Sequence, residues 1–137
     1  MSPADPEFGQ SLDIDVLGVS RVPLEEIERL LELALASAGI ESGHVAVEFV
    51  SAERIAELNA EFRGRAGPTD VLSFAIDGAD PSPGPPELGD IVICPEHTAD
   101  LREAIVHGAL HLTGMDHETD DGEMLAVQRE IMAWVTP

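Results

Sequence analysis

The chain has 137 residues, of which 44% are hydrophobic. This is enough apolar material for one domain with a buried core, and it excludes a globally disordered chain. The 27 acidic residues outnumber the 7 basic ones, all arginine, so that the formal net charge is −20. Such a charge argues against binding of nucleic acid phosphates over a broad surface and is compatible with a high-salt habitat. The single cysteine, Cys94, excludes an internal disulfide framework and a cysteine-rich zinc site.

The N-terminal segment "MSPADPEFGQ" has neither the basic start nor the apolar run of a signal peptide. We therefore expect residues 1–10 to be disordered and residues 11–137 to form a single domain. No stretch approaches the roughly 20 apolar residues of a membrane span. A cytoplasmic protein without a membrane partner is the expectation.

Hydrophobic periodicity, caps and turn residues divide the remaining chain into eight elements. These are a strand at 12–18, a helix at 22–39, a strand at 44–50, a helix from Ser51 to Phe62, strands at 70–76 and 88–94, a helix from about Thr98 to Leu112 and a last helix that follows Asp120. Loops are expected at 63–68 and, rich in glycine and proline, at 77–87. The order predicts an α+β (mixed α/β) fold, a single layered domain with a mixed, mostly parallel sheet of about four strands.

Apolar side chains at helical spacing mark the inward face of three helices. The predicted stripes are Leu24, Ile27, Leu31, Leu35 and Ala38 in the first helix, Ile55, Leu58 and Phe62 in the second, and Met124, Val127, Ile131 and Trp134 in the last. Asp120 and Glu123 have the spacing of a capping box. Cys94 ends the apolar run "IVIC" and is predicted to be a buried hydrophobic residue.

Three of the five histidines fall in the eleven residues "HGALHLTGMDH", at positions 107, 111 and 117. On a helix, His107 and His111 are one turn apart and face the same way. Gly114 can take the left-handed conformation that ends a helix, which would bring His117 back to the same place. Three neutral imidazoles that leave a fourth position open are typical of a catalytic zinc site.

The alternative is that these histidines are polar residues on a packed helix. The helix is apolar nearly all round, so it should be buried, and three buried histidines need partners that a shared ion would supply. The other two, His44 at the start of a strand and His97 at the start of a helix, are expected to be structural or exposed.

The spacing His-x-x-x-His-x-x-Gly-x-x-His also occurs in the metzincin peptidases, in which a glutamate after the first histidine is the general base. Here that position is Gly108. The spacing therefore supports the metal more than it supports peptide hydrolysis.

The histidine stretch closely resembles the signature of the YbeY family of metal-dependent endoribonucleases. Two further segments match in order: "LNAEFRGRAGPTDVLSFAI" at 58–76 and "LGDIVIC" at 88–94. The resemblance covers most of residues 45–135 and implies a YbeY-like metallohydrolase domain. It implies a single-strand-specific endoribonuclease that acts in ribosomal RNA maturation and ribosome quality control. The implied partners are single-stranded RNA and the ribosome or its proteins, with no DNA expected.

The resemblance also implies site residues. One Zn²⁺ would bind to His107, His111 and His117, and Arg63 would act in catalysis by holding the scissile phosphate. Contacts to RNA are expected from Arg63, Arg65 and Ser73 in the matching segment. Asp70 also matches the family pattern, although for Asp70 and Ser73 a role in starting or forming the strand is at least as good an interpretation. Asp116 is predicted either to assist catalysis by orienting a histidine or to cap a turn.

The sequence departs from the family in three places. Met115 replaces a tyrosine, only thirteen residues lie between Ile93 and His107 where relatives carry more, and the overall charge is acidic. Either water or the ribose 2′-hydroxyl could be the attacking group. Two other functions remain open at this point: a metzincin-like hydrolase of peptides, and a ribosome-associated binding protein whose metal is structural.

Overall fold

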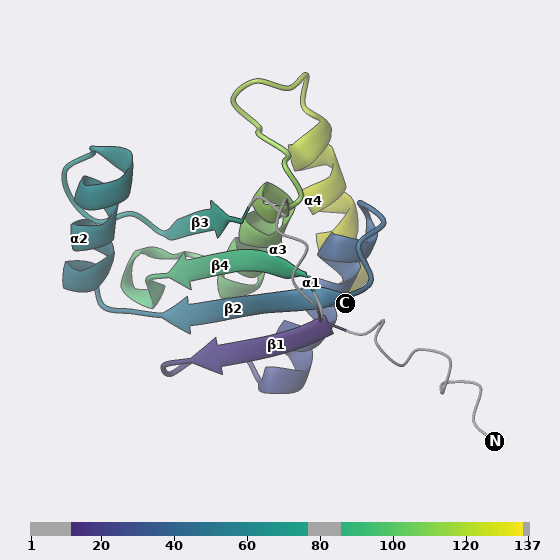
Figure 1. Cartoon of the computed structure of the whole chain (residues 1–137), viewed down its shortest axis with the longest axis horizontal. Helices are drawn as coiled ribbons and strands as arrows, with labels where there is room; N and C mark the ends of the chain where they lie inside the picture. The colour runs from purple at the N-terminus through teal and green to yellow at the C-terminus, as the bar shows by residue number, and fades with distance from the viewer. Residues whose placement is uncertain (1–11, 77–85, 136–137) are drawn as a thin grey trace.

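A computed structural model describes residues 12–76 and 86–135 (Figure 1). Residues 1–10 and most of the predicted loop 77–87 lie outside the described residues. In chain order the elements are β1 (Leu12–Leu17), α1 (Leu24–Ala36), β2 (Gly43–Phe49), α2 (Ala52–Arg63), β3 (Val71–Ala75), β4 (Glu87–Ile93), a short 3₁₀ turn (Pro95–His97), α3 (Leu101–Leu112) and α4 (Glu123–Val135). No helix in the described parts of the chain is long and apolar enough to cross a membrane.

The described strands form one sheet in the order β1-β2-β4-β3. The β1–β2 and β2–β4 pairs are parallel, and β3 runs antiparallel to β4 at the edge. The predicted α+β architecture with a mixed, mostly parallel sheet is therefore confirmed. Strand β4 begins at Glu87, so the last residue of the predicted loop belongs to the sheet.

Two hydrophobic clusters lie on opposite faces of the sheet, because successive strand residues point to opposite sides. The large cluster joins α1, α3 and α4 to the face that carries Val45, Val47 and Ile91. The small cluster packs Ile55 and Leu58 of α2 against the other face. Its remaining buried members are Leu72, Val92 and Cys94. Cys94 is thus a buried hydrophobic residue, as predicted.

Helix caps explain where the helices begin. The Ser51 side chain accepts a hydrogen bond from the backbone N–H of Arg54, as expected for an N-cap. Helix α3 starts at Leu101, later than predicted, because the Asp100 carboxylate caps it by accepting from two backbone N–H groups. His97 consequently lies exposed in the preceding turn and does not open the helix. Before α4, Asp120 accepts from the N–H of Met124, but Glu123 bonds to the N–H of Asp121, so the capping box is only partly formed.

Four residues assigned to inward stripes are exposed. Leu24 and Ala38 lie at or beyond the ends of α1, where the helix no longer covers the sheet. Phe62 is 58% exposed, since its described aromatic partner is Phe74 on the edge strand, with ring centroids 5.3 Å apart. Trp134 is 73% exposed, because the buried stripe of α4 is centred on Met124, Gln128 and Ile131 and Trp134 falls beside it.

His44 joins three strands through its two ring nitrogens. Nε2 lies 2.8 Å from a carboxylate oxygen of Asp15 on β1, and Nδ1 pairs with the carboxylate of Glu87 on β4. These hydrogen bonds, that to Glu87 first, raise the pKa of His44 to about 9. The structural role expected for this histidine is therefore the one observed.

This pairing predicts a pH-dependent stability. Because the folded-state pKa of about 9 exceeds the ordinary value of 6.5, the contribution is complete below pH 6.5 and is lost as the pH rises through 9. Two pairs with exposed carboxylates should stabilise the fold by about 1–2 kcal/mol in all. Denaturant titrations of wild type and His44→Gln should differ by this amount at pH 6 and converge above pH 9. A difference that stays constant with pH would contradict the assignment.

Candidate metal centre and cleft

Helix α3 and the turn after it bring the three histidines together. His107 and His111 project from α3 one turn apart, and the ring centroids are 4.8 Å apart. The helix ends at Leu112 with Thr113 as its C-cap, and Gly114 adopts a φ of +97°, which reverses the chain. His117 then lies 5.0 and 5.4 Å from the other two rings, measured between centroids. The predicted helix end at Leu112 and the left-handed conformation of Gly114 are both confirmed.

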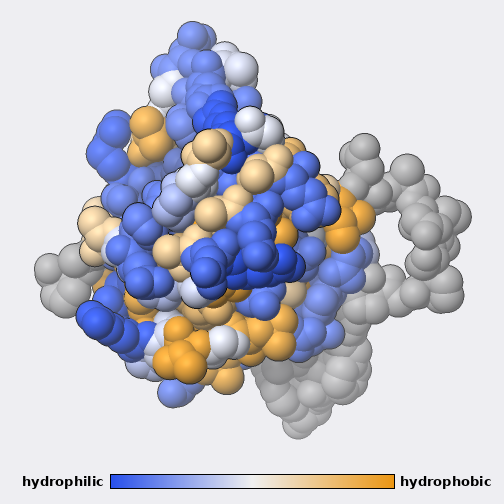
Figure 2. All heavy atoms as spheres, turned by 90° about the vertical axis from the view of Figure 1, so that its left-hand side faces the viewer, coloured by the Kyte–Doolittle hydropathy of each residue, from blue (hydrophilic) through white to orange (hydrophobic). Residues whose placement is uncertain are grey.

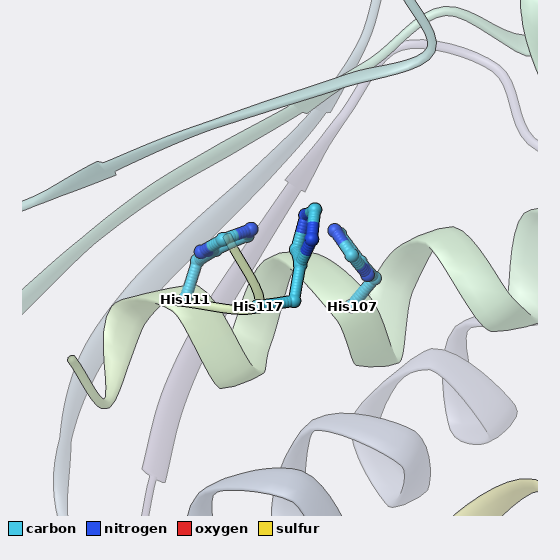
Figure 3. Close-up of side chains that lie close together, drawn as sticks. All are labelled: His107, His111 and His117. Carbon is cyan, nitrogen blue, oxygen red and sulfur yellow. The ribbon is translucent and has the colours of Figure 1, made fainter. Parts of the chain in front are cut away.

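The three rings face one another on one side of α3 (Figure 3). One possible ligand atom from each side chain lies within 4.8 Å of those of the other two. Three imidazole nitrogens are a donor set found in catalytic zinc sites, in which a fourth position stays open for a further ligand. The cluster could therefore hold a metal ion.

The histidines are half-buried, contrary to the prediction of full burial. Burial of α3 is confined to the side that faces the sheet and the neighbouring helices, and its histidine side opens to a cleft. Partial burial is still enough to lower the pKa of His111, and the nearby His107 lowers it further. A lowered pKa keeps this imidazole neutral, which is the form that binds a metal.

Hydrogen bonds to the Nδ1 atoms orient two of the rings. His111 Nδ1 lies 3.0 Å from the backbone oxygen of Met115, and His107 Nδ1 lies 2.8 Å from Oε1 of Gln128 on α4. Each ring can then direct Nε2 toward the cluster. Sequence reasoning missed Gln128. The only signal was that a polar residue lies in the middle of an apolar stripe, one turn after Met124 and one turn before Ile131.

A cleft of about 540 Å³ connects the histidines to the loop that follows α2. Arg63 ends that helix, and Gly64, with a φ of +65°, turns the chain toward Arg65. Buried Asn59 holds the loop in place, because its side-chain amide donates to the carbonyl of Gly67 over 2.9 Å. Both arginines are exposed and line the cleft, as does Ser73. That they bind RNA stays a prediction.

Gly108 explains why α3 lies so close to the sheet. A Cβ atom at this position would be 2.5 Å from a side-chain carbon of Ile91, which is too close for any side chain. The Ser73 hydroxyl donates to the carbonyl of Gly108 over 3.0 Å and joins β3 to the same turn of the helix. A glutamate cannot occupy position 108 in this packing. The general base of the metzincin peptidases therefore has no equivalent here.

Asp70 and Asp116 line the cleft, and the described hydrogen bonds of their side chains are local. Asp70 accepts from the N–H of Val71 at the start of β3, which fits its interpretation as a strand-entry residue. Asp116 accepts from the N–H of Glu118, the turn-capping alternative. A catalytic role for Asp116 stays a prediction. The segment between β4 and α3 forms the 3₁₀ turn and the Asp100 cap.

Hydrophilic side chains cover most of the end of the molecule at which α2 lies, with hydrophobic ones gathered below (Figure 2). The loop at residues 63–68, called the arginine loop below, carries two exposed arginines, Arg63 and Arg65, in a protein whose formal net charge is −20. An α+β domain in which such a loop faces three converging histidines across one cleft has the organisation of a metal-dependent hydrolase.

Comparison with known proteins identifies the family. A family model described as endoribonuclease YbeY matches residues 19–136. Curated relatives named endoribonuclease YbeY include one from Rubrobacter xylanophilus, 41% identical with 84% of this chain and 87% of the relative covered. Another, from Bacillus subtilis, is 36% identical over 89% of this chain and 94% of the relative. The chain belongs to the YbeY family of endoribonucleases, which are hydrolases that act on RNA.

A solved structure supports the same conclusion. A protein from Thermotoga maritima, determined in solution, is 33% identical and superposes with a TM-score of 0.54. The alignment covers 86% of this chain and 85% of the other.

Proposed function

We propose that this protein is a zinc-dependent, single-strand-specific endoribonuclease that matures ribosomal RNA and takes part in ribosome quality control in the cytoplasm. The observation that carries the proposal is the position of Arg63 across one cleft from the three histidines. Family membership supports RNA as the substrate. The ribosome and its proteins are the proposed partners.

His107, His111 and His117 would hold the ion, which when bound supplies a Lewis acid and an acidified water. Arg63 would donate hydrogen bonds to the scissile phosphate and offset the charge that develops on it. Arg65 would bind a neighbouring phosphate, and Ser73 would support the cleft wall through its bond to Gly108. With position 108 closed to a carboxylate, proton transfer falls to water, to the 2′-hydroxyl of the RNA or to Asp116 at the cleft.

Two observations weigh against the other functions. A hydrolase of peptides would need a base where Gly108 packs against Ile91. A purely structural metal is usually enclosed by four protein ligands. Among residues 12–76 and 86–135, the candidate metal-binding group has three, and it opens to the cleft.

The test is cleavage by the zinc-loaded protein of one RNA sequence supplied as a single strand and as a duplex, with casein as a third substrate. We expect the single strand to be cut and the duplex and casein to stay intact. A single strand can splay its bases and adapt its backbone to the cleft, whereas pairing and stacking hold a duplex in one form. Casein cleavage with intact RNA would show that the peptidase alternative is correct.

A further inference from the structure

Gln128 is a buried polar residue where the pattern of α4 calls for an apolar one. It is 8% exposed, and among residues 12–76 and 86–135 only Asn59 shares this property. Asn59 holds the arginine loop, so its burial has an evident function. Buried polar groups are retained where they find a hydrogen-bond partner. The partner of Gln128 is His107, on the neighbouring helix.

The direction of this hydrogen bond decides which nitrogen of His107 is free. Oε1 of Gln128 lies 2.8 Å from Nδ1, and an amide oxygen can only accept, so Nδ1 carries the proton. Nε2 then keeps its lone pair for a metal. His111 is oriented in the same way by the carbonyl of Met115, 3.0 Å from its Nδ1. A backbone carbonyl can only accept, so in this hydrogen bond Nδ1 of His111 must be the donor.

The side-chain amide of Gln128, by contrast, has both an accepting oxygen and a donating NH₂ group. If the Gln128 side chain turned over, its NH₂ group would donate to Nδ1, the proton would move to Nε2, and His107 could not bind a metal. An ionised carboxylate at the same position could only accept. It would also make the imidazole a stronger donor to the metal.

We propose that Gln128 is a positioning residue that selects the metal-binding form of His107, and that its amide holds the metal less tightly than a carboxylate would. The proposal rests on the proposed function, because it takes the metal to be bound by the three histidines. It assigns to α4 a role in the site that lies outside the histidine motif.

The experiment compares zinc affinities, measured by competition with a chromophoric chelator, for wild type, Gln128→Met and Gln128→Glu. Losing an outer hydrogen-bond partner of a metal ligand typically weakens binding by about 10- to 100-fold, and we expect this for Gln128→Met. Gln128→Glu should instead tighten zinc binding by about 10-fold. A residue with only a packing role would not give changes of opposite sign.

Two controls separate the hydrogen bond from packing and from charge. Met124→Leu changes a fully buried neighbour on the same face of α4 and should leave the zinc affinity unchanged. Ala99→Glu adds a carboxylate to a cavity of about 260 Å³ that Gln128 and His107 also line, but with no bond to the ring. We expect it to raise the affinity less than Gln128→Glu does.

The outcomes are distinguishable. If wild type binds zinc and Gln128→Glu binds it equally or more weakly, the role of Gln128 is overturned while the proposed function stands. If wild type binds no zinc, the proposed function fails and this inference fails with it. Should Gln128→Met not fold, Gln128→Glu decides alone, since it keeps the size and the accepting oxygen of the native side chain.

Discussion

Replacing His111 by alanine will remove most of the metal from the protein. His111 is one of the three proposed ligands, and the Met115 carbonyl already orients its ring. Its loss should weaken zinc binding by more than the roughly 10- to 100-fold cost of losing an outer hydrogen-bond partner. Elemental analysis and chelator competition measure the effect. His97→Ala, which removes an exposed histidine outside the cluster, is the matched control and should keep full zinc.

The same site predicts that zinc binding weakens in acid, because a protonated imidazole cannot bind a metal. Burial lowers the pKa of His111 below its ordinary value of 6.5. As a proposed ligand, His111 therefore stays neutral at a lower pH than an ordinary histidine does. Full zinc occupancy in His111→Ala would show that the three histidines are not the ligands.

Replacing Arg63 by alanine will abolish most of the RNA cleavage and leave the metal in place. The mutation removes a charge-assisted contact to the phosphate. Its absence in the transition state should raise the activation free energy by about 2–4 kcal/mol, which lowers the rate roughly 30- to 1000-fold. Arg63 is exposed at the end of α2 and is not a member of the histidine cluster that could hold the metal. Zinc content and melting temperature should therefore match those of wild type.

The control for Arg63→Ala is Arg129→Ala, which removes the same charge from an exposed position on α4. It should cleave RNA at the wild-type rate. Arg63→Lys keeps the charge but loses the two-pronged donor geometry, and we expect an intermediate rate. A wild-type rate for Arg63→Ala would show that this arginine does not act in catalysis.

The histidine cluster could be predicted from the sequence because its geometry is local. The helical repeat places His107 and His111, and a glycine three residues after His111 brings His117 back to them. The sheet could be predicted in kind, since alternating elements with a late pair of strands favour a mixed sheet. Family resemblance added Arg63, to which composition and periodicity alone give no role.

What could not be predicted depends on contacts between elements. The bond between Gln128 and His107 joins residues 21 positions apart on two helices, and no local pattern encodes their approach. The carboxylates around His44 come from two other strands, so they depend on strand order and register. The prediction that Trp134 faces inward is wrong, because the sequence does not distinguish an apolar side chain beside the buried stripe from one within it. The positions of the neighbouring helices decide this.

The histidines and the arginine loop are anchored in different hydrophobic clusters, on opposite faces of the sheet. The helices α3 and α4 belong to the large cluster, while the helix that ends in Arg63 is held by a small one with five buried residues. Segments with few buried contacts open first when a protein is stressed. Gentle heating would therefore unfold the cleft wall that carries Arg63 before the wall that carries the histidines. The resulting molecules would still hold the metal but could not bind a phosphate through Arg63. Catalytic inactivation would then precede metal loss, and it would reverse on cooling.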